Sequence, residues 1–120
     1  MIEQLPDLPG TVVGVRATGR VTAEDYESVL MPAIERAIKE HGHIRLLYIL
    51  DCNVTDFSLG AMWDDAKLGF SHLQDFERIA IVTDDHFVRN TLRAFHFAMP
   101  HFVGIFRAGE EEKAIAWLAA

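Results

Sequence analysis

Most of the side chains that could do chemistry lie between residues 50 and 85, and most of them are carboxylates. This stretch contains eight acidic and two basic residues, which gives it a net charge of −6. Two of the acids, Asp51 and Asp84, follow apolar stretches that are typical of buried strands. In open α/β sheets, ligands usually bind beyond the carboxyl ends of the strands. We therefore predict a binding surface there, and its negative charge disfavours a bare phosphate as the ligand.

The same carboxylates could bind a divalent cation or serve an active site. Mg²⁺ and Ca²⁺ prefer oxygen ligands, but this stretch lacks a regular ligand loop. The six histidines lack a His-x-x-x-His or Cys/His set, which disfavours zinc. We predict no metal and no cofactor. No complete set of nucleophile, base and orienting group is recognisable, so we predict no catalytic residue and rank an enzyme using Asp51, Asp84 or Ser58 last.

Cys52 and Ser58 are the two nucleophile types in the loop after residue 51. A phosphatase-type loop would need an arginine six residues after Cys52, where Ser58 stands, so an inert, half-buried thiol is the preferred interpretation. Ser58 precedes a predicted helix, and its oxygen can cap that helix. If Ser58 were phosphorylated, the added charge would be stabilised by the helix end and repelled by Asp51 and Asp56.

Residues 86–109 have the opposite charge, because they contain three arginines, three histidines and no acid. On the predicted helix, His86, Arg89 and Arg93 fall on one side. An acidic partner, or the acidic half of a second copy, could dock on that side. The alternative interpretation is a solvated helix face.

Aromatic side chains form the third group of interest. Trp63 falls in the apolar stripe of a helix predicted over residues 59–73, where core packing and a ligand platform are the two interpretations. Four phenylalanines form a cluster in the sequence shortly before the last predicted helix: Phe95, Phe97, Phe102 and Phe106. An exposed apolar patch would mark a homodimer interface, or a pocket for a small apolar or lipid-like ligand beneath Phe57, Trp63 and Phe97.

Hydrophobic periodicity predicts the element order ββαβαβαβα. The strands are predicted at residues 2–5, 11–19, 44–50, 79–83 and 102–106, and the helices at 22–41, 59–73, 85–99 and 110–118. The first two strands form a hairpin, and Arg16 with its neighbouring glycines favours an edge or half-exposed position for the second, rather than the sheet centre. Thr22 and Asp25 form a capping box, and Pro32 interrupts the first helix. Strands that alternate with helices predict an α/β fold with a mostly parallel sheet.

Composition limits the class of protein. The chain has 120 residues, 50% of them hydrophobic and 24% charged, which predicts a single folded domain over residues 1–120. A net charge of −7 disfavours a general nucleic-acid binder. No apolar run reaches the length of a membrane span, and no export signal is recognisable. A single cysteine does not require an oxidising compartment, so we expect a cytoplasmic protein.

Four segments together carry a family resemblance: Gly19–Tyr26, Ile44–Tyr48, Gly60–Lys67 and Phe76–Asp84. Through them the chain resembles the SpoIIAA-like family, small bacterial proteins related to the STAS domains of anti-anti-sigma factors and anion transporters. The resemblance covers essentially the whole chain and implies a mixed sheet of about five strands with four helices. In anti-anti-sigma STAS proteins, a phosphorylatable serine begins the helix after a central strand. Ser58 is the approximate counterpart, in a turn that matches the family pattern only in part.

The sequence therefore predicts a cytoplasmic STAS-like module that acts by protein–protein interaction in bacterial regulation. Its binding surface is predicted to comprise Asp51, Asp56, Phe57, Ser58, Trp63 and Asp84. Ser58 is the candidate phosphosite, and a homodimer is an alternative to a monomer. A carrier of a small apolar or lipid-like ligand is the second hypothesis, and an enzyme that uses strand-end carboxylates is the third.

Overall fold

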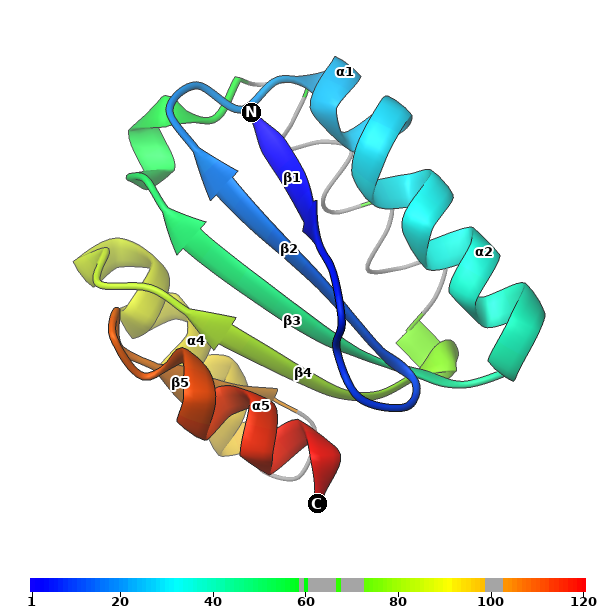
Figure 1. The fold of residues 1–120 in the computed structure, drawn as a ribbon. Coiled ribbons are helices and arrows are strands. Elements are labelled where there is room, and N and C mark those ends of the chain that lie inside the picture. Colours follow the sequence, from blue (N-terminus) through cyan, green and yellow to red (C-terminus); the bar gives the residue numbers. More distant parts are fainter. Residues whose placement is uncertain (59, 61–66, 68–72, 99–102) are drawn as a thin grey trace.

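A five-stranded mixed sheet organises the chain (Figure 1). The computed structural model describes residues 1–58, 60, 67, 73–98 and 103–120. The strands are β1 (Ile2–Leu5), β2 (Val12–Thr18), β3 (Ile44–Asp51), β4 (Phe76–Val82) and β5 (Val103–Phe106). Their spatial order is β1-β2-β3-β4-β5; β1 is antiparallel to β2, and all other neighbours are parallel. The predicted mixed, mostly parallel sheet with an antiparallel start is confirmed.

Helices and short helical turns connect the strands. They are α1 (Ala23–Asp25), the π-helix η1 (Tyr26–Leu30), α2 (Met31–His41), the 3₁₀ turns η2 (Val54–Asp56) and η3 (Leu73–Asp75), α4 (His86–Ala98) and α5 (Glu111–Ala119). Of the helix predicted over residues 59–73, Gly60 and Lys67 are described and helical, and most of the rest lies outside the described residues. No helix in the described part of the chain is long and apolar enough to cross a membrane.

The predicted capping box and the predicted interruption both occur in the first helical segment. The Asp25 backbone N–H donates to the Thr22 hydroxyl at 3.4 Å, and the Thr22 backbone N–H donates to the Asp25 carboxylate at 2.8 Å. Pro32 stands in the first turn of α2, immediately after the π-helical turn. Because proline has no N–H to donate to the preceding turn, a local change of helical register accommodates it.

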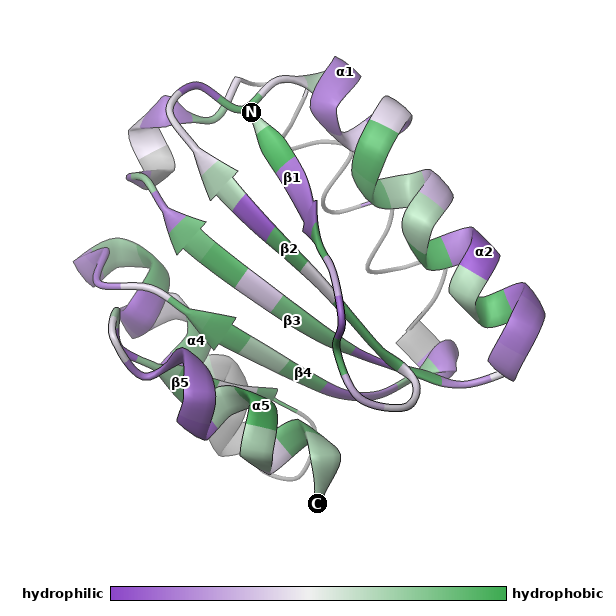
Figure 2. Cartoon of the chain, viewed as in Figure 1, coloured by the Kyte–Doolittle hydropathy of each residue, from purple (hydrophilic) through white to green (hydrophobic). Residues whose placement is uncertain are grey.

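Two apolar layers cover the two faces of the sheet, because alternate residues of each strand point to opposite sides. On one face, Leu30 and Ile34 of the helical segment pack with Val15 of β2 in one cluster of buried residues. On the other face, α5 contributes Leu118 to a cluster with Leu47 and Val82. Figure 1 shows α5 in front of the sheet, and Figure 2 shows β3 and β4 largely in the colour of apolar residues. The strands therefore form the apolar centre of the molecule.

The predicted edge position of residues 11–19 is wrong. β2 lies between β1 and β3, and Val15 and Ala17 are fully buried. The glycine that favoured an edge has a packing reason, since a side chain at Gly14 would overlap Leu8 of the β1–β2 connection. Arg16 remains half-buried, and its guanidinium lies 3.8 Å from the Asp51 carboxylate. The true edge strands are β1 and β5.

Candidate functional site

The loop that follows β3 is closed by a carboxylate. Asp56 ends the turn η2, and its side chain accepts a hydrogen bond from the Asn53 backbone N–H at 3.0 Å. The Asp56 N–H in turn donates to the Asn53 carbonyl at 2.9 Å. Aspartate favours such turns because its short side chain reaches a nearby backbone N–H. Asn53 and Thr55 are exposed on this fixed turn.

The loop is also attached to the chain segment that follows β2. The Val21 N–H donates to the Asp56 carbonyl at 3.0 Å, and the Ser58 N–H donates to the Val21 carbonyl at 2.9 Å. Phe57 thereby forms an isolated parallel bridge with Val21, and its half-buried side chain packs against the α2-side apolar layer. Two backbone bonds and one apolar anchor therefore fix the position of the loop.

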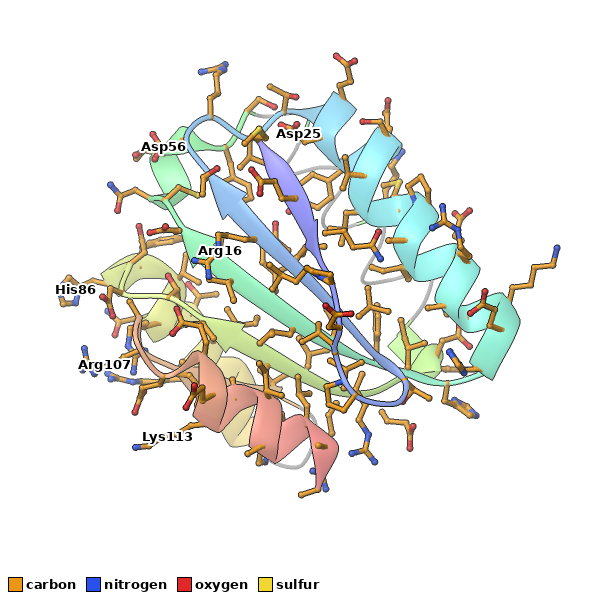
Figure 3. The ribbon with its side chains drawn as sticks, in the orientation of Figure 1. Arg16, Asp25, Asp56, His86, Arg107 and Lys113 are labelled. Carbon is orange, nitrogen blue, oxygen red and sulfur yellow. The ribbon has the colours of Figure 1, made fainter. Side chains whose placement is uncertain are left out.

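Exposed and half-buried polar side chains gather at this end of the sheet. We call them the strand-end rim: Asp51, Asn53, Thr55, Asp56, Ser58 and Asp84. The Asp51 carboxylate lies 3.8 Å from the Arg16 guanidinium in an exposed pair. The Asp84 carboxylate accepts a hydrogen bond from the Ala108 N–H at 3.2 Å. Figure 3 shows Asp56 at the margin of the molecule, beyond the strand ends. These acids shape loops and still present oxygens to solvent.

Cys52 lies among the rim carboxylates and carries a weakly acidic thiol. Burial, followed by the negative charges of Asp56, Asp51 and Asp85, raises its pKa, and the N-terminal ammonium group opposes this only in part. A thiol with a raised pKa is mostly protonated at neutral pH, and the thiolate is the reactive form. Cys52 is therefore a poor nucleophile.

Ser58 lies within the described residues, whereas two of the aromatic candidates do not. The Ser58 side chain is half-buried, and its Oγ would lie 3.8 Å from a Cβ atom at Gly60. The predicted helix cap at Ser58 involves residues that are mostly not described. Trp63 and the side chain of Phe97 also lie outside the described residues. The structure thus brings together Asp51, Asp56, Phe57 and Ser58 of the predicted site.

A second group of polar contacts joins α4 to the ends of β4 and β5. The Asp85 carboxylate accepts from the Val88 N–H at 3.0 Å and so caps α4. Arg89, one turn later, donates from Nη1 to the carbonyls of Thr83 at 3.0 Å and Phe106 at 3.1 Å. The sequence predicted either a docking face for an acidic partner or a solvated helix face. Arg89 fits neither interpretation, because its side chain reaches inward to the strand ends.

Arg89 also lines a cavity that sequence reasoning missed. The cavity has a volume of about 380 Å³ and lies between α4, β5 and α5. We call it the arginine cavity; its lining residues are Arg89, Arg93, Val103–Phe106 and Trp117. The only local signal was the spacing of Arg89 and Arg93, four residues apart on one helix face. His86 and Arg107, by contrast, are exposed at the outer margin of this region (Figure 3).

The described residues do not bring acidic, histidine and cysteine side chains together in a metal-binding arrangement. Within residues 1–58, 60, 67, 73–98 and 103–120, no group of three such residues could hold a metal ion.

Comparisons with known proteins agree with this geometry. The SpoIIAA-like family model matches residues 12–119. No curated protein matches the chain. A similar solved structure is that of an uncharacterized protein of the DUF3478 family from Shewanella loihica PV-4, described as having a SpoIIAA-like fold. It is 30% identical, with a TM-score of 0.70 over 98% of this chain and 92% of that chain. The family model spans nearly the whole sheet and its helices, and the chain therefore belongs to the SpoIIAA-like family.

Proposed function

We propose that the protein is a STAS-like interaction module of bacterial regulation, which binds a protein partner through the strand-end rim in the cytoplasm. The observation that carries this proposal is the way the rim is held. Hydrogen bonds from Val21 and Ser58 fix the loop backbone, while Asp51, Asn53 and Thr55 remain exposed on it. A prepositioned surface loses little conformational entropy when a partner binds, so its contacts contribute more fully to affinity.

The chemistry of the rim indicates the kind of partner surface that would fit. Residues 51–58 contain two acids and no base, and both acids present carboxylate oxygens next to exposed amide and hydroxyl groups. Such groups accept hydrogen bonds from lysine, arginine or backbone N–H donors. A basic partner surface would be guided to the rim by charge, with an association rate that falls as salt concentration rises.

The contacts of the rim favour binding over catalysis. Asp56 holds a turn, Asp84 holds the Ala108 N–H, and the pKa of the Cys52 thiol is raised. A general base or nucleophile needs a free lone pair directed at a reacting atom. Asp56 and Asp84 each accept a hydrogen bond from loop backbone, and the Cys52 thiol is mostly protonated at neutral pH, so each group has a structural explanation and the interaction module is preferred to an enzyme.

A pair of arginine substitutions tests the proposal. Thr55→Arg adds a bulky cation to the exposed rim, and Gln74→Arg adds the same side chain to an exposed 3₁₀ turn before β4, at the opposite strand end. The tagged variants are used for quantitative affinity capture and mass spectrometry in the native bacterium. We expect one specific partner to be lost from Thr55→Arg and kept by Gln74→Arg. Equal capture of every protein by both variants would refute a role for the rim.

Ser58 provides the regulatory part of the proposal. Ser58→Asp adds a negative charge beside Asp56 and is expected to change capture of the same partner while the melting temperature stays nearly constant. Ser58→Ala is expected to cost about 1 kcal/mol of stability if the hydroxyl caps the following helix. Equal partner binding by wild type and Ser58→Asp would eliminate the switch.

A carrier of a small apolar or lipid-like ligand is the second candidate. It is favoured by the apolar layer on which Phe57 packs, because the hydroxyls of Tyr26 and Tyr48 lie within that layer, 2.6 Å apart. Apolar walls with a few fixed polar groups are typical of small-molecule sites. Native mass spectrometry of freshly purified protein separates the candidates, because a carrier retains extra mass and an interaction module shows only monomer or homodimer.

A further inference from the structure

We propose that the arginine cavity binds a small organic anion that has an aromatic or apolar body. This site is separate from the strand-end rim and does not depend on the proposed function. Its volume of about 380 Å³ lies within the range of roughly 300 to 1,000 Å³ that is usual for small-molecule sites. Three consecutive elements form its walls, namely α4, β5 and α5.

The charge of the lining residues selects an anion. Among the seven described residues that line the cavity, Arg89 and Arg93 are the titratable ones. Neither forms an ion pair within the described part of the chain. The buried Nε atom of Arg89 also has no hydrogen-bond partner within the described residues. Guanidinium groups bind carboxylates and phosphates through two parallel hydrogen bonds.

The position of Arg89 is fixed before any ligand binds. Its Nη1 donates to the carbonyls of Thr83 and Phe106, which hold the guanidinium at the ends of β4 and β5. Arg93 is exposed one turn later on the same helix face, where it can move toward a bound anion. One arginine is therefore preorganised and the other is adaptable.

The opposite wall selects an apolar or aromatic body. The rings of Phe106 and Trp117 lie with their centroids 6.0 Å apart and their planes tilted by 55°. Both rings lie directly over Gly104, since a Cβ atom there would be 2.9 Å from the Phe106 ring and 3.0 Å from the Trp117 ring. The absence of a side chain at residue 104 therefore lets these rings form the wall beside the arginines.

A further arginine contacts Trp117. The Arg78 guanidinium lies 5.2 Å from the centroid of the Trp117 ring and donates to the Trp117 carbonyl at 2.6 Å. Arg45 makes a similar contact with the carbonyl of Leu118. These bonds fix the last turn of α5 against β3 and β4, so the aromatic wall does not need to form when the ligand arrives.

A small ligand fits this site better than an added β-strand. β5 is an edge strand of only four residues. The carbonyl of Phe106, at its end, already accepts from both the Thr83 N–H and Arg89. Little of the edge is left for a peptide to extend, whereas the cationic and aromatic walls remain available to a compact anion.

Four probes test the proposal by NMR titration of the backbone amides of β5 and the indole N–H of Trp117. They are benzoate, phenyl phosphate, benzamide and inorganic phosphate. We expect saturable shifts with benzoate or phenyl phosphate, and affinity at least about tenfold weaker for uncharged benzamide, because it lacks the charge-assisted hydrogen bonds. Equal binding of benzamide and benzoate would overturn the anion requirement. Inorganic phosphate that binds as tightly as phenyl phosphate would overturn the need for an aromatic body.

Substitution of an exposed arginine keeps the test independent of folding. Arg93→Gln removes one positive charge from the cavity and is expected to weaken the binding of benzoate and phenyl phosphate at least about tenfold with an unchanged melting temperature. Arg36→Gln, on the exposed side of α2, is the matched control and should bind like wild type. Wild-type affinity in Arg93→Gln, or no saturable shift with any probe, would refute the site.

Discussion

The strand-end rim and the arginine cavity solve the same local problem with opposite charges. Where parallel strands end, backbone groups lose their ladder partners and need new ones. In the rim, carboxylates of Asp56 and Asp84 accept from backbone N–H groups. At the cavity, Arg89 donates to two backbone carbonyls. In both regions, charged side chains satisfy backbone groups that have lost their ladder partners. The same requirement places negative charge at the rim and positive charge at the cavity.

The largest expected effect is at Arg89. Arg89→Met keeps much of the side-chain volume but removes the Nη1 donor from the carbonyls of Thr83 and Phe106, and the Phe106 carbonyl then keeps the Thr83 N–H. We expect a loss of about 2 to 3 kcal/mol in the free energy of unfolding, measured by urea denaturation, because these are hydrogen bonds to a charged group. Arg93→Met is the control, since it lies one turn further along and is exposed. Similar losses in both variants would show that the bonds to the strand ends are unimportant.

The next effect is expected on the cavity wall. In Gly104→Ala, the new methyl group would lie 2.9 Å from the Phe106 ring and 3.0 Å from the Trp117 ring, which is closer than van der Waals contact. Overpacking of this kind costs about 2 kcal/mol, and displacement of Trp117 should also change the near-ultraviolet circular dichroism. The double variant Gly104→Ala with Phe106→Leu provides the control. If the two losses simply add, the proposed contact between residue 104 and the rings is wrong.

On the rim side of the molecule, Asp25 gives a pH-dependent effect of intermediate size. Burial alone would raise its pKa, but hydrogen bonds from Thr22 and the N-terminal ammonium group outweigh this, so the pKa lies below its ordinary value of 3.8. The charged form therefore stabilises the fold above that value, and this contribution is lost as pH falls through the lower folded pKa. Asp25→Asn should cost about 1 kcal/mol at neutral pH by the usual scale of helix caps.

The test of this effect is the difference in unfolding free energy between wild type and Asp25→Asn as a function of pH. We expect the difference to be constant near neutral pH and to shrink below pH 3.8. The same series with Glu24→Gln, an exposed neighbour in the same turn, should show a flat difference. A gap that grows in acid would contradict the assigned sign.

The smallest effect is expected at Asp51. Its pair with Arg16 is exposed and 3.8 Å long, so Asp51→Asn should change the free energy of unfolding by less than about 0.5 kcal/mol. The same substitution should weaken capture of the partner lost from Thr55→Arg, and the loss should be greatest at low salt. Unchanged capture at every salt concentration would separate Asp51 from the rim's binding surface.

Features that depend on neighbours in the sequence were predictable, and features that join distant segments were not. The capping box needs only Thr22 and Asp25, which lie three residues apart, so the local sequence pattern is enough to predict it. The inward turn of Arg89 depends on a carbonyl seventeen residues away at Phe106. Likewise, the burial of β2 depends on β1 and β3 flanking it, which composition alone does not reveal.

The candidate site divides in the same way. The family resemblance and the strand ends pointed to the carboxyl end of β3, where Asp51, Asp56, Phe57 and Ser58 lie in one loop, and the role of this loop in binding stays a prediction. The arginine cavity escaped prediction because its lining comes from three elements whose contact is set by tertiary packing. Trp117 in particular has no local signal for a ligand wall, since a tryptophan in a final helix is ordinary core material.

The bridge between Val21 and Phe57 has a mechanical consequence. Val21 directly precedes Thr22, which caps the first helical segment. An outward movement of the loop would have to break the two hydrogen bonds between Val21 and the loop, or else move the helix start together with the loop. The start of the first helical segment is thus mechanically coupled to the loop. A force applied to the loop would therefore be transmitted to that helical segment.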